Sequence, residues 1–383
     1  MKRVVMLNSM SFLPFQGRYL RIYNEAKTLV EAGYDVTLIA WDRDENCPAF
    51  ENIDGIKVER IPLKAGFVKG PANALKHIPF NAKLLKRIFS RDMDVIHCFN
   101  LDTMLVGLSV AKLRRKKVTL DLCEPSYYSN WSKRYLPLIK AIGGTERFLS
   151  KHFDCIFVHN LYQMRKFKEY GVRYLEHVCS APQAKMIVET PSVHTGAKQI
   201  VLGRIGTIYP ESGFEETVDA VRYMIENGAP IKLLLAGKIM DVYKETFESL
   251  IRPIEAHIEV TGSYHPGQLA DLYARTDLSI QLYRLTDWWK NITPTKFFES
   301  LAHGVPVIVS DMGDLRELIE KHQCGIVVDE ADPQNILHGM EQAIRDSDRI
   351  REMAENGLRL VREEYNWDVM GNRFLNRYNS MFA

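Results

Sequence analysis

The order of apolar segments constrains the fold of this 383-residue chain more than any other feature. Short β-branched runs alternate with longer amphipathic segments, beginning with "RVVMLN" at 3–8, "GRYLRIYNEAKTLVEAG" at 17–33 and "DVTLIAW" at 35–41. Buried strands separated by helices are typical of parallel sheets that carry helices on both faces. The pattern therefore predicts an α/β fold.

The strand-like runs fall into two series, separated by the polar segment "ETPSVHTGAKQ" at 189–199. The first series continues with 94–99, 117–122 and 155–160, and the second comprises 200–208, 231–237, 258–264, 278–283, 305–311 and 324–329. A chain of this length also suggests two domains, because one domain takes roughly 150 residues. We predict two Rossmann-like domains that face a cleft, with ligands bound at the carboxyl ends of the strands.

The net charge of +2 is unevenly distributed. Residues 1–190 hold 30 Lys and Arg against 19 Asp and Glu, whereas residues 191–383 hold 20 against 29. The positive charge is concentrated at 68–92 and in "KLRRKK" at 112–117. The first of these stretches is either a core-packed helix with a basic rim or an amphipathic element that contacts anionic lipid or a phosphate-bearing acceptor. Nucleic acid is not expected, because no binding motif or stacking aromatics accompany the charge.

Composition excludes several other classes of protein. A hydrophobic content of 46% with 26% charged residues is ordinary for a globular protein. No window approaches the roughly 18 apolar residues of a spanning helix, and the N-terminus reads as a buried strand instead of a signal peptide. The six cysteines are scattered without the paired spacing of metal sites. We expect a cytoplasmic protein with reduced thiols and no metal, lying at the inner face of the membrane if its basic segment contacts lipid.

The stretch "TPTKFFESLAHGVPVI" at 293–308 carries the most specific signal. Its proline suits the first turn of a helix, whose amides then remain free for an anion. Glu299 lies one turn beyond Thr295 on the same face. A carboxylate there can accept hydrogen bonds from both vicinal hydroxyls of a ribose, while Lys296 and the amides from Thr293 to Thr295 bind a diphosphate. This stretch therefore predicts a nucleoside diphosphate site.

Loops after the strands of the first series offer weaker candidates. Gly17 and Arg18 follow the first strand at a helix start, where they form either an ordinary cap or a loop that binds an acceptor or a phosphate. Asp121 and Glu124 follow the run at 117–122. They are either turn residues or catalytic groups that accept hydrogen bonds from sugar hydroxyls or take up a proton.

Two loops of the second series contain glycine beside a cation. "RIGTIYPESG" at 204–213 supplies Arg204 and Gly206, and "AGKIMD" at 236–241 supplies Lys238. Both loops could hold the phosphates of a donor, although each loop by itself is common.

At 294–311 the sequence resembles the retaining family 4 glycosyltransferases of the GT-B fold, also called glycosyl transferases group 1, whose signature is P-x-K-x-x-E-x-x-A-x-G-x-P-V-I. The end of the chain, 363–382, is similar to the closing helix of that family, which crosses back to the N-terminal domain. The resemblance implies an acceptor-binding domain of residues 1–188 plus 367–383 and a donor-binding domain of residues 196–366. It also implies that Glu299 binds the donor ribose.

Several positions depart from the family pattern. Asn291 replaces the first acidic residue of the E-x7-E form, and Cys123 replaces the active-site histidine. The Arg and Lys that meet the diphosphate fall near Thr207 and Ser212, and the N-terminal Gly-Gly reads Gln16-Gly17. Possible replacements for the missing cations are Arg204, Lys238, Arg284 and Lys290.

The resemblance implies an enzyme that transfers a sugar with retention from a UDP- or GDP-linked donor, without a metal cofactor. The acceptor would be a lipid-linked or polysaccharide intermediate of cell-surface glycan synthesis, bound to the basic N-terminal domain. The alternative is a non-catalytic GT-B homologue that binds a nucleotide, a glycan or a partner enzyme. Release of nucleoside diphosphate distinguishes the two, because only turnover produces it.

Overall fold

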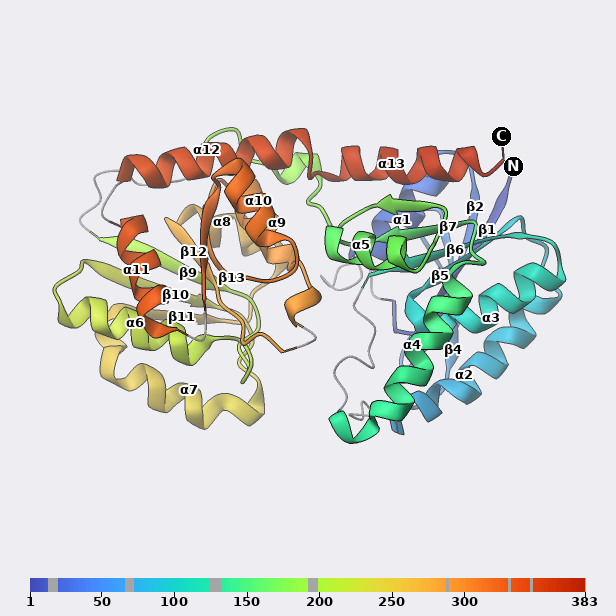
Figure 1. The fold of residues 1–383 in the computed structure, drawn as a ribbon, viewed down its shortest axis with the longest axis horizontal. Helices are drawn as coiled ribbons and strands as arrows, with labels where there is room; N and C mark the ends of the chain where they lie inside the picture. The colour runs from blue at the N-terminus through green and yellow to red at the C-terminus, as the bar shows by residue number, and fades with distance from the viewer. Residues whose placement is uncertain are drawn as a thin grey trace. The chain divides into compact units, whose positions relative to one another are not determined.

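The computed structural model describes residues 1–12, 20–65, 72–123, 132–191, 199–286, 289–329, 332–344 and 347–382. They divide into two compact units, Met1–Ser180 with Asp368–Ala383 and Ala181–Trp367, whereas the sequence placed the boundaries at 188, 196 and 366. Each unit is a sheet covered by helices (Figure 1). The α/β class is therefore confirmed for both units.

The first unit contains an eight-stranded sheet in the order β3-β4-β2-β1-β5-β6-β7-β8. Its strands are β1 (Arg3–Asn8), β2 (Asp35–Asp42), β3 (Phe50–Ile53), β4 (Ile56–Pro62), β5 (Val95–Phe99), β6 (Lys117–Leu122), β7 (Cys155–Val158) and β8 (Leu175–His177). All neighbours are parallel except β3 and β4. Its helices are α1 (Leu20–Glu31), α2 (Ala72–Phe89), α3 (Asn100–Leu113), α4 (Leu136–Ser150), α5 (Leu161–Glu169) and α13 (Trp367–Ser380).

Alternate residues of the central strands face opposite sides of this sheet, as the strand period requires. Ile96 and Cys98 of β5 belong to the apolar core that contains side chains of α2 and α3. His97, between them, contacts Glu25 of α1 and Tyr378 of α13. The C-terminal helix thus packs in the first unit, and its predicted return to the N-terminal domain is confirmed.

The second unit contains a six-stranded parallel sheet in the order β11-β10-β9-β12-β13-β14. Its strands are β9 (Ile200–Ile205), β10 (Ile231–Ala236), β11 (Ile258–Gly262), β12 (Leu278–Gln281), β13 (Val307–Ser310) and β14 (Gly325–Val328). Its helices are α6 (Phe214–Glu226), α7 (Lys244–Ile251), α8 (Leu269–Ala274), α9 (Thr295–Ala302), α10 (Leu315–His322), α11 (Pro333–Ile344) and α12 (Ser347–Glu363). Among the described residues, no helix is long and apolar enough to cross a membrane.

Candidate functional site

The start of α9 lies at the centre of the predicted donor site. Pro294 is the residue before the helix, with φ −65° and ψ 137°, and no side chain in the described part of the chain caps it. Thr295, the first helical residue, is exposed. The first amides of a helix have no partner within it and carry its positive dipole end. The helix start can therefore receive an anion, as the sequence predicts.

Lys296 and Glu299 form an ion pair on this helix. The Lys296 ammonium lies 2.8 and 3.0 Å from the two carboxylate oxygens of Glu299, and 2.9 Å from the hydroxyl of Tyr264. Burial acts to lower the pKa of Lys296, but the charge of Glu299 and the contact with Tyr264 raise it above its ordinary value. The amine therefore stays charged, and its charge is balanced within the site.

Two glycines bring the ends of β9 and β10 close to this pair. Gly206 has φ 143°, and a Cβ atom there would stand 4.0 Å from Cε of Lys296. Gly237 has φ 146°, and its Cβ would stand 2.0 Å from the carbonyl oxygen of Gly206. Both backbones hold a conformation that suits glycine, and the second leaves no space for a side chain. The structure therefore brings Gly206, Lys296 and Glu299 together, with exposed Lys238 directly after Gly237.

Thr293 supports the loop before α9 from beneath. Its side chain is buried, and its hydroxyl donates to the carboxylate of Asp314. Gly313 lies so close that a Cβ atom would stand 2.7 Å from the Thr293 hydroxyl oxygen. The side chain of Thr293 thus positions the loop, whereas Thr295 is exposed at the helix start.

Arg204, which the sequence predicts as a phosphate ligand, is buried inside the second unit. It is only 3% exposed. Its guanidinium donates to the carbonyls of Ile280 at 3.2 Å and Ser212 at 2.7 Å. It also lies 4.9 Å from the ring centre of Tyr283. These contacts engage both terminal nitrogens of the guanidinium, whereas its Nε is buried without a hydrogen-bond partner among the described residues. Arg204 thus holds the 204–213 loop in place, and its role as a phosphate ligand stays a prediction.

The other candidate replacement cations differ in exposure and pairing. Arg284 forms ion pairs with Glu215 and Glu216 of α6. Lys238 and Lys290 are exposed. Of these two lysines, Lys238 lies just after the end of β10, which is close to Gly206. Lys296 and Lys238 are therefore the cations best placed to meet a diphosphate.

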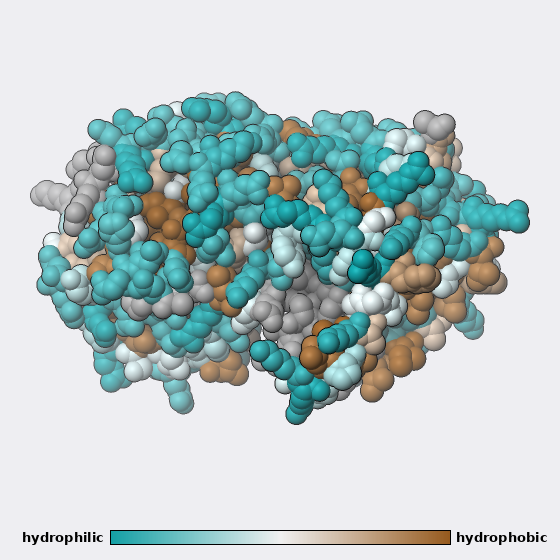
Figure 2. All heavy atoms as spheres, in the orientation of Figure 1, coloured by the Kyte–Doolittle hydropathy of each residue, from teal (hydrophilic) through white to brown (hydrophobic). Residues whose placement is uncertain are grey.

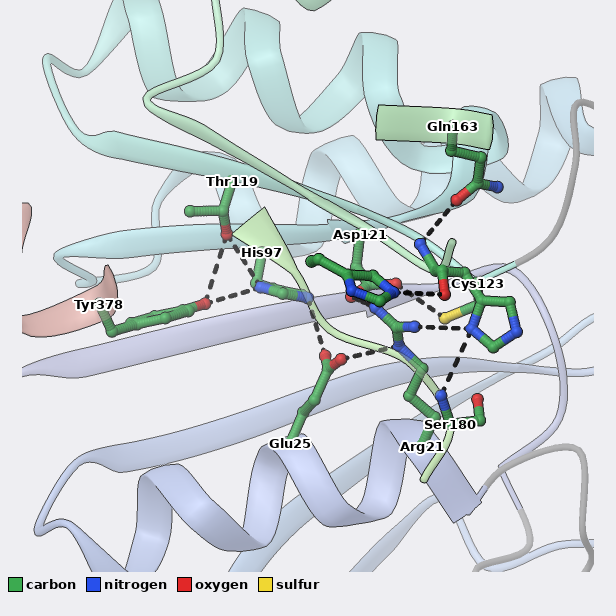
Figure 3. Close-up of polar contacts among 11 residues, drawn as sticks. Arg21, Glu25, His97, Thr119, Asp121, Cys123, Gln163, Ser180 and Tyr378 are labelled. Carbon is green, nitrogen blue, oxygen red and sulfur yellow. Dashed lines mark hydrogen bonds and ion pairs between the residues drawn. The ribbon is translucent and has the colours of Figure 1, made fainter. Parts of the chain in front are cut away.

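In the first unit, Asp121 belongs to a buried network of charged groups (Figure 3). It lies near the end of β6 and has no exposed surface. Its carboxylate accepts hydrogen bonds from Arg21 of α1 at 2.5 Å and from the thiol of Cys123 at 2.9 Å. Arg21 also donates to Glu25 at 3.0 Å and contacts Nδ1 of His159 at 3.1 Å. One guanidinium therefore joins α1 to the carboxyl ends of β6 and β7.

His97 extends the network to the C-terminal helix (Figure 3). Its Nδ1 lies 2.7 Å from the Tyr378 hydroxyl and 2.9 Å from the Thr119 hydroxyl, and its Nε2 lies 3.4 Å from Glu25. Burial lowers the pKa of His97 to about 4, so the ring is neutral at physiological pH.

The two carboxyl groups of this network are also shifted by burial. Burial raises the pKa of Asp121 to about 7, although Arg21 acts against it and Glu25 adds to it. Burial likewise raises the pKa of Glu25. Two carboxylates that share one guanidinium in a dry core favour a proton on one of them.

Glu25, His97 and Asp121 have ligand-type atoms within 4.8 Å of one another. Arg21 already contacts both carboxylates with its positive charge. A metal ion at this point would face that guanidinium at short range, which is electrostatically unfavourable. The network is therefore better described as a proton-sharing ion-pair cluster than as a metal centre.

Both halves of the chain match family models. Residues 190–359 match the family described as glycosyl transferases group 1, and residues 19–179 match the glycosyl transferase 4-like domain. The chain is a glycosyltransferase of the GT-B fold. The predicted family and enzyme class are thus confirmed.

Two curated relatives of this glycosyltransferase extend over most of its length. An uncharacterized glycosyltransferase, MJ1607 of Methanocaldococcus jannaschii, is 23% identical over 92% of this chain and 91% of that protein. A GDP-mannose-dependent alpha-mannosyltransferase of Mycobacterium tuberculosis is 24% identical over 83% of this chain and 82% of that protein.

Solved structures with the same fold also cover the whole chain. A sucrose-phosphate synthase of Thermosynechococcus elongatus has a TM-score of 0.78 at 15% identity, covering 100% of this chain and 99% of that one. Anabaena Alr3699/HepE in complex with UDP has a TM-score of 0.73 at 14% identity, covering 99% and 100%. At these identities the likeness supports the GT-B fold alone.

Cys123 stands where the family resemblance implies an active-site histidine. Burial and the nearby Asp121 raise the pKa of this thiol well above its ordinary value, so it is a neutral donor to Asp121. It cannot act as a base in that form. The other predicted groups of the first unit, Gly17, Arg18 and Glu124, lie outside the described residues.

Sequence reasoning missed Arg21, Glu25 and His159. The available signal was the i, i+4 pair of opposite charges at 21 and 25, within a helix that also contains buried Ile22, Ala26 and Leu29. In an amphipathic helix, charged residues are usually predicted to face solvent. The pattern therefore places Arg21 and Glu25 on the exposed face, whereas the structure buries both.

Proposed function

We propose that this glycosyltransferase takes its sugar from a nucleotide sugar whose nucleoside diphosphate binds the second unit. The observation that carries the proposal is the Lys296–Glu299 pair at the start of α9, beside Gly206 at the end of β9. Glu299 would accept hydrogen bonds from the ribose hydroxyls, and Lys296 with the first amides of α9 would bind the diphosphate. The names of the relatives, GDP-mannose-dependent in one and bound to UDP in another, support a GDP- or UDP-linked donor.

The site holds its own cations for the leaving diphosphate. Lys296 is kept charged, Lys238 is exposed at the end of β10, and the helix dipole of α9 adds to both. Such preorganised positive charge stabilises a developing anion. We therefore propose that transfer proceeds without a metal cofactor, and with retention as the family resemblance implies.

The acceptor is proposed to be a lipid-linked or polysaccharide intermediate of cell-surface glycan synthesis, bound to the basic first unit. In α2, Phe80, Leu84 and Ile88 are buried, whereas Leu75 and Ile78 are 66% and 63% exposed. Hydrophobic patches lie among hydrophilic atoms over the part of this unit where Figure 1 shows α2 (Figure 2). Exposed apolar side chains beside lysines and arginines favour contact with an anionic membrane.

The second candidate is a member of this family that has lost turnover and only binds its ligands, which the neutral thiol of Cys123 and the enclosed carboxyl of Asp121 favour. The experiment that separates the two is a panel of UDP- and GDP-sugars, with and without membrane extract as acceptor, scored by release of nucleoside diphosphate. The proposal expects release with at least one donor, unchanged when EDTA is added. Binding of a nucleotide with no release from any donor would favour the second candidate.

A further inference from the structure

A pocket of about 470 Å³ lies at the edge of the first sheet where its strands begin. Lys117 begins β6 and Lys116 directly precedes it, and Asp94 and Asp154 directly precede β5 and β7. The end of α3 and Phe382 complete the walls. Asp121, near the carboxyl end of β6, lies toward the opposite edge of the sheet. The pocket is therefore separate from the site described above.

The charged lining consists of four cations and two carboxylates, and the carboxylates are already engaged. Asp94 accepts from the backbone amide of Arg3 at 2.8 Å. Asp154 accepts from the amide of Val118 at 2.8 Å and lies 3.5 Å from the Lys117 ammonium. Within the described ranges, no ion pair is formed by the three remaining cations, Lys112, Arg115 and Lys116. Four cations against two carboxylates leave the lining of this pocket with a net positive charge.

The backbone at Arg115 supports a role for its side chain. After α3 the chain turns through Arg115 with φ 54°, closed by hydrogen bonds from the Arg115 amide to Lys112 at 3.3 Å and from the Lys116 amide to Ala111 at 2.8 Å. This left-handed position after a helix is the usual place of glycine, because an L side chain is disfavoured there. The chain nevertheless carries an arginine whose side chain lines the pocket.

The negative end of the α3 dipole explains the presence of only one of the lysines in the pocket lining. It favours Lys112 in the last helical turn. It does not account for Lys116 and Lys117, which lie beyond the turn at the beginning of a strand. Two different elements therefore deliver cations to the same open pocket, an arrangement that suits an anion.

We propose that this pocket binds a phosphate-bearing anion. Arg115 would donate hydrogen bonds to a phosphate group from its planar guanidinium, and the ammonium groups of Lys112 and Lys116 would attract it electrostatically. With three cations that lack an ion pair in the described structure, the pocket suits a ligand with more than one negative charge. The phosphate can belong to a lipid headgroup or to a soluble molecule, and the two sources are separable by experiment.

The test follows hydrogen exchange of residues 110–118 in the full-length protein with two probes. The first is inorganic pyrophosphate, and the second is a pair of vesicles, phosphatidylcholine with and without phosphatidic acid. The variant is Lys112→Gln with Arg115→Gly, in which glycine removes the cation and suits the left-handed backbone, so folding is retained. The controls are Arg252→Gln, at an exposed position of the second unit, and Lys296→Ala, which weakens the proposed donor site.

Pyrophosphate is expected to slow exchange at 110–118, with an affinity about tenfold lower in the double variant and unchanged in both controls. Slowing by phosphatidic acid vesicles alone would assign the phosphate to a lipid headgroup, and slowing by pyrophosphate would assign it to a soluble ligand. The inference is overturned if neither probe slows exchange there, or if the double variant responds as the wild type does.

Discussion

The side chains of the ion-pair cluster in the first unit show how single residues acquire their properties from burial. Asp121 and His97 are both fully enclosed, and their pKa values move in opposite directions, to about 7 and about 4. In each case burial disfavours the charged form. These residues therefore link the stability of the first unit to pH in opposite senses.

Asp121→Asn is expected to change that pH dependence. The carboxyl of Asp121 binds its proton more tightly in the folded state, so the free energy of unfolding falls as pH rises from 3.8 to about 7. His97 binds its proton more weakly when folded, so the free energy of unfolding falls as pH drops from 6.5 to about 4. The two effects offset each other in the wild type between about 4 and 6.5. The variant should lose the first effect and become more stable as pH rises over that range.

Urea unfolding at several pH values measures this, with Asp271→Asn at an exposed position of α8 as the control. A variant whose stability follows the wild-type pH profile would show that Asp121 does not hold its proton as described.

Arg204 provides a second prediction at this scale. Arg204→Leu leaves the carbonyls of Ile280 and Ser212 without their donor. The expected loss in the free energy of unfolding is about 1–3 kcal/mol, compared with little change for Arg252→Leu on the surface. Chemical denaturation measures the loss. If the variant keeps wild-type stability and instead loses affinity for UDP and GDP, Arg204 is a phosphate ligand after all.

Among the secondary-structure elements, the ends of β9, β10 and β11 set the geometry of the donor site. The amide of Gly206 donates to Ala236 at 2.8 Å, and the amide of Gly237 donates to Gly262 at 2.7 Å. Close approach of these strand ends depends on the missing side chains. The position of Gly206 beside Lys296 therefore depends on Gly237.

Gly237→Ala tests this dependence against Gly228→Ala. Both glycines have positive φ, but a Cβ atom at Gly237 meets the Gly206 carbonyl at 2.0 Å, whereas Gly228 has nothing within 4 Å. Gly237→Ala should cost about 1–3 kcal/mol more in unfolding free energy and should weaken nucleotide binding. Parallel thermal unfolding and calorimetric titrations compare the two variants. Equal losses would mean that the strand ends adjust without affecting the site.

The elements that sequence analysis predicted best are the buried central strands. The runs at 3–8 and 117–122 coincide with β1 and β6, because continuous β-branched sequences leave little alternative. The β3–β4 hairpin was not predicted, since β3 is exposed and lacks an apolar pattern. The donor loop at 293–299 could be predicted because its chemistry is local in sequence. The partners of Asp121 were not, since Arg21 lies 100 positions away and only the fold brings them together.

For the molecule as a whole, the charge asymmetry predicts a preference for anionic membranes. The first unit carries most of the positive charge and exposes apolar residues such as Leu75, Ile78 and Phe89 of α2. The protein should sediment with anionic vesicles at low salt and dissociate as ionic strength rises, because exposed charges are screened over about 10 Å at 0.1 M. Ile78→Ser should weaken sedimentation. Equal binding to neutral vesicles, or none to either kind, would remove the membrane interpretation.

The central claim for the whole molecule is that its second unit binds a nucleoside diphosphate through Glu299 and Lys296. The direct measurement is calorimetric titration of UDP, GDP and the corresponding nucleosides into wild type, Glu299→Ala, Lys296→Ala and the exposed control Glu226→Ala. Loss of a charge-assisted hydrogen bond, about 1.5–3 kcal/mol, should lower affinity in Glu299→Ala on the order of ten- to a hundredfold for nucleotide and nucleoside alike. Lys296→Ala should weaken mainly the diphosphate. A folded Glu299→Ala that binds every nucleotide as tightly as wild type does would contradict the account.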